Sequence, residues 1–304
     1  MTTDPKTTMT QPTPISVAQK LRKGIALIWA SNYPHHRRPL AGALHDAERM
    51  SACLPPGFEI RRSLGPQLIR ATLLRQLREV LEDAEPGEIV IVFFSGHGGI
   101  CYFRRPDGRV SEQPHRYLVT EDEAVLDVEV SVLVAKLAER GVMVLWISDC
   151  CYAQGIVRSG LPSAALEQDE DDDERDSLAT TGRVIKRVPP RVRDWPTHYG
   201  ADYPEYSSFA GWLAAQREQG VLDPHGHPLV VRISASSAEQ PAYEGRDEDG
   251  VPGGLLTIEL CPLLAEHDKR RSVGRIMALL RARLAAGNHA ALQRPEAEGP
   301  ADRL

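Results

Sequence analysis

Hydrophobic runs alternate with amphipathic segments along most of the chain. Continuous apolar runs of strand length, rich in β-branched and aromatic residues, predict buried strands. The expected strands are Gly24–Ala30, Phe58–Leu64, Ile89–Phe94, Val142–Ile147 and His227–Ala235, with a short extended piece at Tyr117–Val119. Apolar residues at helical spacing predict helices at Leu40–Leu54, Pro66–Ala84, Val130–Arg140, Leu255–Ala265 and Ser272–Ala286. This alternation predicts an α/β protein with right-handed crossovers and a mainly parallel sheet that is covered on both faces.

Two parts of the chain lack this pattern. Residues 1–20 carry prolines among threonines and are expected to form a disordered leader. Residues 156–227 contain an acidic run, a basic proline-rich segment and one helical piece, so they are interpreted as a long activation or linker loop. The loop divides the fold into a first part, residues 21–155, and a second part, residues 228–304, which completes the same domain.

Composition excludes several classes of protein. The 304 residues are 42% hydrophobic, which is enough for a packed core. The net charge of −6 belongs to the run 167–176, without which 34 acidic and 35 basic residues are left, so nucleic-acid binding is not expected. No membrane helix or secretory signal is expected, and five scattered cysteines fit a reducing cytoplasm better than a disulfide framework.

Two of the expected strands end in reactive residues. Ile89–Phe94 runs into Ser-Gly-His97-Gly-Gly, and Val142–Ile147 runs into Ser-Asp-Cys150-Cys151-Tyr, so that His97 and Cys151 are 54 positions apart. The carboxyl ends of neighbouring parallel strands meet at one edge of a sheet, where ligands bind in open α/β folds. This arrangement suggests a thiolate nucleophile with an imidazole base, and the amide of Gly98 could donate to an oxyanion beside the amide of the nucleophile.

The same residues have simpler interpretations. A Gly-His-Gly sequence after a strand can be a tight turn or a weak phosphate loop, and a cysteine at a strand end is usually a small buried hydrophobe. Two such endings on neighbouring strands favour a reactive site, but periodicity alone leaves both interpretations open.

Four segments, in the expected order, resemble the caspase-fold cysteine peptidases, above all the metacaspases and bacterial caspase-like proteases. LAGALHDAERM resembles the family's Gly-x-x-x-Asp-Ala segment, with Asp46 matching; IVIVFFSGHGG matches the catalytic-histidine strand. SDCCYAQG resembles Asp-x-Cys-His-Ser-Gly, and SASSAEQPAYE followed by GGLLTIEL resembles the small-subunit segment. The resemblance spans residues 21–304 and implies a caspase-like three-layer sandwich with a six-stranded, mainly parallel sheet.

The resemblance also implies residue roles. His97 would be the general base and Cys151 the nucleophile, with the Gly98 and Cys151 amides as the oxyanion hole; Cys151 is preferred to Cys150 because the family's nucleophile lies two positions after the aspartate. Tyr152 and Ala153 depart from the family's His-Ser. Asp149 and Glu244 match the two acidic positions of the family's pocket for the residue before the scissile bond. Such a pair would favour Arg or Lys in protein or peptide substrates.

The loop and the partners follow from the same resemblance. The loop lies where the family separates its large and small subunits, and five basic residues there are candidate processing sites of a zymogen: Arg183, Lys186, Arg187, Arg191 and Arg193. A solvated insert without regulatory function is the alternative. No cofactor is expected to be required, although calcium activates some metacaspases. The resemblance also suggests that an upstream protease or a regulatory protein activates the enzyme. It further suggests a role in a bacterial stress, death or antiviral pathway.

Two other classes of function are alternatives to a peptidase. A caspase-fold pseudoprotease or adaptor is the main alternative, although both His97 and a cysteine are retained. A doubly wound ligand-binding protein is disfavoured because the Gly-x-Gly-x-x-Gly turn that a dinucleotide fold needs does not follow Gly24–Ala30.

Overall fold

A six-stranded sheet forms the centre of the molecule in a computed structural model, which describes residues 24–104, 115–151, 184–186, 191–194, 227–237, 240–266, 272–287, 289 and 293–300. The strand order is β12-β9-β7-β3-β1-β2. Five strands are mutually parallel and β12 runs antiparallel along the edge. The strands are β1 (Gly24–Ala30), β2 (Phe58–Leu64), β3 (Ile89–Ser95), β7 (Met143–Asp149), β9 (Val230–Ser234) and β12 (Glu296–Glu298). The prediction of a mainly parallel six-stranded sheet is confirmed.

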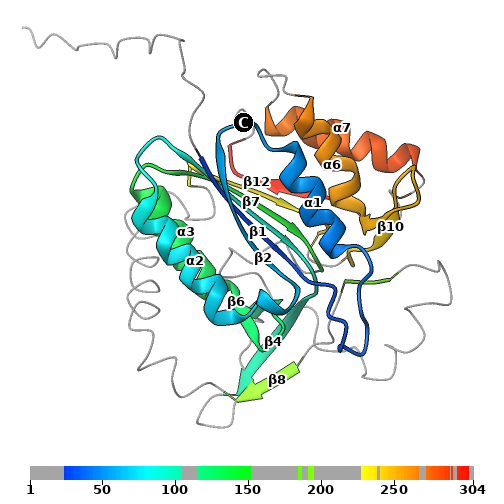
Figure 1. The fold of residues 1–304 in the computed structure, drawn as a ribbon, viewed down its shortest axis with the longest axis horizontal. Coiled ribbons are helices and arrows are strands. Elements are labelled where there is room, and N and C mark those ends of the chain that lie inside the picture. The colour runs from blue at the N-terminus through cyan, green and yellow to red at the C-terminus, as the bar shows by residue number, and fades with distance from the viewer. Residues whose placement is uncertain are drawn as a thin grey trace, which may run out of the picture.

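Helices cover both faces of this sheet, which gives the three layers of Figure 1. On one face lie α1 (Ala43–Cys53), α6 (Leu255–Ala265) and α7 (Val273–Ala286); on the other lie α2 (Arg70–Asp83) and α3 (Asp127–Glu139). Each interface is a hydrophobic core, because successive side chains of a strand point to opposite faces. In β3, for example, Phe93 packs toward α1 and α6, whereas Phe94 packs toward α2 and α3.

A second, smaller sheet lies beyond the main one and differs from the expected pattern (Figure 1). Its order is β6-β5-β4-β8, and a separate hairpin pairs β10 with β11. The strands are β4 (Gly98–Arg104), β5 (His115–Val119), β6 (Ala124–Leu126), β8 (Arg191–Asp194), β10 (Glu244–Arg246) and β11 (Pro252–Gly254). Only Tyr117–Val119 was expected to be extended here, because the other strands are short or contain glycine and charged residues.

Several expected helix boundaries shift by a few residues. The segment expected to begin a helix at Pro66 first forms a 3-10 turn at Gly65–Gln67, and α2 then begins at Arg70. Helix α3 begins three residues before the expected Val130, and its first turn contains Asp127 and Glu129, where acidic side chains are favourable. Within the described parts of the chain, no helix is long and apolar enough to span a membrane.

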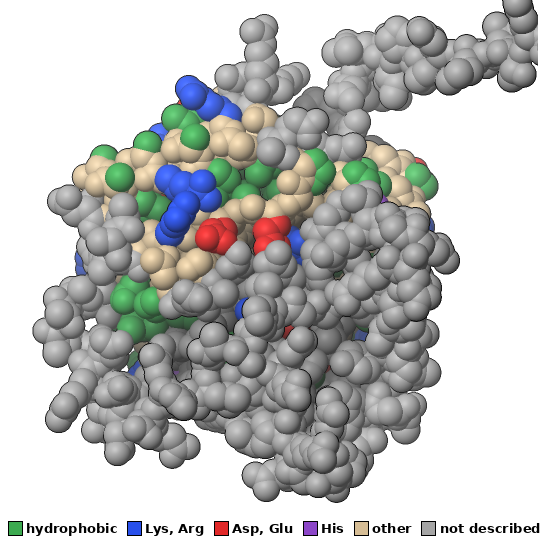
Figure 2. Space-filling model, turned by 180° about the vertical axis from the view of Figure 1, so that it is seen from behind, with side chains coloured by type: hydrophobic (Ala, Val, Ile, Leu, Met, Phe, Trp, Pro, Cys, Tyr) green, Lys and Arg blue, Asp and Glu red, His purple; other side chains and the backbone are tan. Residues whose placement is uncertain are grey.

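The described surface mixes charges of both signs. On the face shown in Figure 2, Lys and Arg side chains lie near Asp and Glu, with hydrophobic side chains between them. Among the described large hydrophobic residues, Ile60 is exposed, at 38% of its surface.

Candidate active site

His97 lies directly after β3 and is fully buried. Its Nε2 is 2.7 Å from the carbonyl oxygen of Arg38. Because a carbonyl can only accept, Nε2 carries the proton in the neutral ring, and Nδ1 has the free lone pair. Nδ1 has no hydrogen-bond partner among the described residues. The ring is therefore oriented to accept a proton at Nδ1.

The surroundings of His97 keep its ring neutral. Burial lowers its pKa to about 4, and the nearby His36 and Lys186 act in the same direction, while the backbone of Arg38 and Lys186 opposes the shift. Tyr33 lies beside the ring, at 5.1 Å between centroids, and its hydroxyl donates to the carbonyl of Val119 and accepts from the amide of His97. Tyr33 has a φ of 47°, an unusual backbone conformation that is retained beside functional groups.

The two cysteines point to opposite faces of the sheet. Cys150 is buried in the core that faces α2 and α3, and burial raises the pKa of its thiol well above the ordinary value. Cys151 belongs to the core that faces α1 and α6, where its Sγ accepts from the amide of Ala242 at 3.0 Å. The two thiols, which lie just after the end of β7, are thus in different environments.

The amides of Gly98 and Cys151 point at one oxygen atom. Both donate to the carbonyl oxygen of Lys186, each at 3.2 Å. Position 98 requires glycine, because a Cβ there would lie 2.2 Å from the carbonyl oxygen of Cys151. Two converging backbone amides are the usual way in which a peptidase stabilises an oxyanion.

The segment Val184–Lys186 lies across this edge and pairs through its main chain with residues 242–244. Ile185 forms an antiparallel bridge with Tyr243. The amide of Lys186 donates to the carbonyl of Ala242, and the amide of Glu244 donates to the carbonyl of Val184, both at 2.9 Å. An extended peptide bound through its main chain in this way is a typical mode of peptide recognition.

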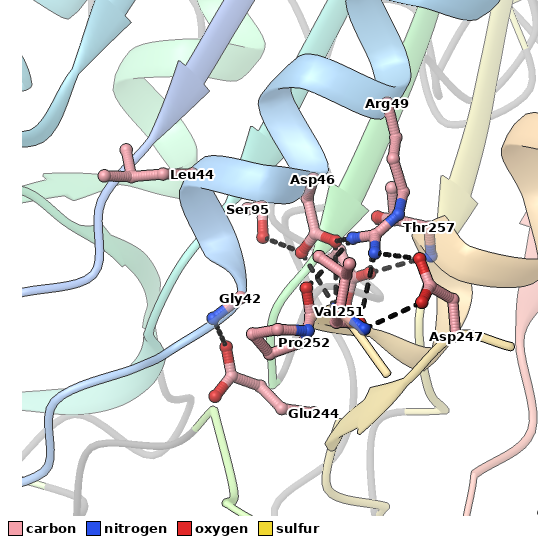
Figure 3. Close-up of polar contacts among 12 residues, drawn as sticks. Gly42, Leu44, Asp46, Arg49, Ser95, Glu244, Asp247, Val251, Pro252 and Thr257 are labelled. Atoms are coloured by element: carbon pink, nitrogen blue, oxygen red, sulfur yellow. Dashed lines mark hydrogen bonds and ion pairs between the residues drawn. The ribbon is translucent and has the colours of Figure 1, made fainter. Parts of the chain in front are cut away.

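The side chain of Lys186 enters an acidic pocket and is fully buried. Its Nζ lies 3.2 Å from Asp46 Oδ2, 3.2 Å from Asp149 Oδ1 and 2.9 Å from Ser95 Oγ. The register of the sheet pairs Ser95 in β3 with Asp149 in β7. Asp46 comes from α1, whose first turn lies over the same edge (Figure 3).

Backbone donors hold both carboxylates in place. Gly254 donates its amide to both oxygens of Asp46, at 3.0 and 2.9 Å. Ser95 donates its hydroxyl to Asp46 Oδ2 at 2.7 Å (Figure 3). Thr257 donates its amide and its hydroxyl to Asp149 Oδ2, at 2.9 and 2.6 Å. These bonds join α1 to the end of β11 and β7 to the start of α6.

The charges in the pocket are strongly coupled. Burial raises the pKa of Asp46 to about 7; Lys186 opposes the shift and Asp149 adds to it. Burial lowers the pKa of Lys186, but the charges of Asp149 and Asp46 raise it more, so it lies above its ordinary value. The ammonium group is therefore charged, and the pocket selects a cation.

Glu244 lies beside this pocket and does not contact the Lys186 ammonium directly. Its carboxylate accepts from the amides of Ala41 and Gly42, at 3.0 and 2.7 Å, at the start of α1 (Figure 3). Its charge still contributes to raising the pKa of Lys186. The second acid in contact with the ammonium is Asp46.

The other predicted processing sites and the acidic run are not part of the described site. Arg183 and Arg187 are outside the described residues, as is the acidic run 167–176; Arg191 and Arg193 belong to β8. Within the described parts, no group of three or more His, Cys, Asp or Glu side chains is arranged to hold a metal ion. Sequence reasoning did not assign roles to Asp46, Ser95, Thr257 or Gly254, although Asp46 was part of a matching segment.

Comparison with known proteins agrees with the architecture, a mainly parallel sheet between helical layers with His97 and Cys151 at neighbouring strand ends. Residues 23–301 match the caspase domain family, so the chain belongs to the caspase family and carries its peptidase domain. A crystal structure of protein GSU0716 from Geobacter sulfurreducens has a similar fold, with a TM-score of 0.59 and 18% identity over 91% of this chain and 94% of that chain. A search of curated proteins found no match.

Proposed function

We propose that the protein is a cysteine endopeptidase of metacaspase type that cleaves after lysine or arginine, and that it is a zymogen. The main support for this proposal is Lys186, because its main chain occupies the oxyanion site while its side chain occupies the acidic pocket. Its carbonyl oxygen accepts from the Gly98 and Cys151 amides, while its ammonium lies between Asp46 and Asp149. The segment Val184–Lys186 is thus bound as a substrate of its own site.

The chemistry follows from this placement. His97 Nδ1 takes the proton of the Cys151 thiol, and the thiolate attacks the carbonyl carbon of Lys186. The Gly98 and Cys151 amides stabilise the oxyanion that forms. His97 then delivers the proton to the nitrogen of Arg187 as the peptide bond breaks, and water hydrolyses the thioester with His97 again as the base.

Cys151 rather than Cys150 fits the nucleophile. Its amide is already in the oxyanion site, and its thiol lies beside the backbone of Ala242, which also binds Lys186. Cys150 lies in the opposite core, and its raised pKa makes a thiolate there unfavourable.

The zymogen proposal connects this site with regulation. Substrate proteins cannot enter while Lys186 fills the pocket, so cleavage of the Lys186–Arg187 bond, by the enzyme itself or by an upstream protease, would let the segment leave. Activation by cleavage is what a regulatory protease needs, so we place the protein in a bacterial stress, death or antiviral response. We propose that it acts in the cytoplasm.

Mass spectrometry of the purified full-length protein tests the proposal. We expect two fragments, residues 1–186 and 187–304, from the wild type and from Cys150→Ala, and an uncut chain from Cys151→Ala and Lys186→Gln. Cutting that persists in Cys151→Ala would exclude this nucleophile. A wild type that cleaves neither itself nor basic peptides, even after added trypsin, would favour the adaptor alternative.

A further inference from the structure

The pocket around Lys186 is closed on all sides. The side chain has no exposed surface, and its Nζ has four oxygen neighbours within 3.2 Å: Asp46 Oδ2, Asp149 Oδ1, Ser95 Oγ and the main-chain oxygen of Asp149. The three N–H donors of the ammonium group bond to Asp46 Oδ2, Ser95 Oγ and the main-chain oxygen of Asp149, while Asp149 Oδ1 is in ion-pair contact without a hydrogen bond. The lysine side chain therefore fills the pocket completely.

Gly254 closes the far end of the pocket. A Cβ at this position would lie 2.4 Å from Lys186 Nζ and 2.1 Å from Asp149 Oδ2. The backbone of Gly254 therefore lies directly against the ammonium group. Its amide is also the donor that holds Asp46, so the end of the pocket cannot retreat without losing that carboxylate's hydrogen bonds.

Arginine would need space that this pocket lacks. The guanidinium carbon of an arginine would take the position of Nζ, and its two terminal nitrogens would extend about 1.3 Å further, the length of a C–N bond with partial double-bond character. The oxygens around Nζ already lie at 2.9–3.2 Å. The walls would have to move outward by roughly one bond length.

The carboxylates are also poorly placed for arginine. A guanidinium binds best when one carboxylate offers both oxygens in a plane. Here both oxygens of Asp46 accept from Gly254, and Asp149 Oδ2 accepts from Thr257 twice. Each carboxylate therefore offers only one oxygen to the cation. Single oxygens that converge on a point charge suit an ammonium group.

We propose that this pocket selects lysine over arginine, with Gly254 and Ser95 as the residues that set the preference. The inference rests on the proposed peptidase function and narrows its substrate class from basic residues to lysine. Natural targets would then carry an extended segment ending in lysine, as the chain's own Val184–Lys186 does.

Matched peptides give the direct test. Processed enzyme would be assayed with two fluorogenic peptides, Val-Ile-Lys and Val-Ile-Arg, that carry the same reporter after the last residue. We expect kcat/KM to favour lysine by about tenfold or more, in the range that a poorly fitting group costs a closed pocket. Equal or better cleavage of the arginine peptide would overturn the inference. Cleavage of neither peptide would instead count against the proposed function.

Variants locate the determinant. Ser95→Ala removes one acceptor from the ammonium and opens space, so the lysine-to-arginine ratio of kcat/KM should fall several-fold; a ratio that stays at the wild-type value would exclude Ser95 as a determinant. Ser51→Ala is the matched control, because its hydroxyl bonds only within α1, to the carbonyl of Ala47, and the ratio should not change. In the full chain, Lys186→Arg should be cut more slowly than wild type, whereas equal rates would contradict a closed pocket.

Discussion

Lys186 makes three different kinds of contact with the candidate site. Its main chain pairs with Ala242, its carbonyl oxygen meets the Gly98 and Cys151 amides, and its ammonium fills the acidic pocket. A surface loop that passed the site by chance would satisfy one of these contacts. The combination is what supports the proposal that the chain is cut after Lys186.

Asp46 should control the pH dependence of substrate binding. Burial raises the pKa of Asp46 to about 7 although the Lys186 ammonium in the pocket lowers it, so a bound lysine favours the ionised carboxylate and lysine binding should strengthen as the pH rises. We expect KM of the processed enzyme for lysine peptides to fall as the pH rises from about 6 to 8, where such a group titrates. Initial rates over this range measure it.

Asp46→Asn separates this effect from the titration of His97. The asparagine side chain keeps the shape of the aspartate but carries no charge. KM for lysine peptides should therefore be higher than in the wild type and nearly constant over the same pH range. His97, with its pKa lowered to about 4, would not change charge there. A KM that still falls with pH in Asp46→Asn would assign the titration to another group.

At the scale of elements, Glu244 fastens β10 to the start of α1. Its buried carboxylate accepts from the backbone amides of Ala41 and Gly42, just before α1. Glu244→Ala should lower the free energy of unfolding by about 1–3 kcal/mol, the usual cost of leaving buried donors unsatisfied. Denaturant unfolding of the uncut Lys186→Gln background measures the change.

The specificity of the Glu244 variants distinguishes a structural role from a substrate-binding one. Glu244→Gln keeps an acceptor and should retain most of the stability, with a smaller rise in KM for lysine peptides than Asp46→Asn. Glu248→Ala, an exposed neighbour, is the matched control and should change neither quantity. If Glu244→Gln raises KM as much as Asp46→Asn does, Glu244 binds substrate as the sequence suggested.

The sequence predicted elements well where burial dominates. β3 and β7 are continuous apolar runs, so their positions and their reactive ends could be expected. The second sheet and β12 could not, because β12 is Glu-Ala-Glu and is held by pairing with β9 rather than by a hydrophobic pattern. The meeting of Asp46 with Asp149 depends on how α1 packs over the sheet edge, which no local pattern encodes.

At the scale of the whole molecule, the proposed cut falls between two strands that pair with each other. β7 precedes the Lys186–Arg187 bond and β9 follows it, and the two run side by side from Val144–Val230 to Ser148–Ser234. The helices α6 and α7 of the second fragment pack in the same core as α1 of the first. Cleavage would therefore leave the β7–β9 pairing and the packing of α1 with α6 and α7 in place, and only the segment around Ile185 would leave the core.

The pocket itself is built from both fragments. Asp46 and Asp149 belong to the first, while Gly254 and Thr257, which hold their carboxylates, belong to the second. Neither fragment alone would position the acids for a lysine. A processed enzyme must keep both fragments together to cleave a substrate.

We therefore expect the processed protein to migrate as one species in size-exclusion chromatography, at the elution volume of the uncut Lys186→Gln variant. Denaturing electrophoresis of the same peak should show both fragments. The fragments should separate only in denaturant, because the β7–β9 ladder and the shared core hold them, and peptidase activity should disappear with that separation. Two peaks under native conditions, or activity in an isolated fragment, would show that the site does not need the assembled sheet.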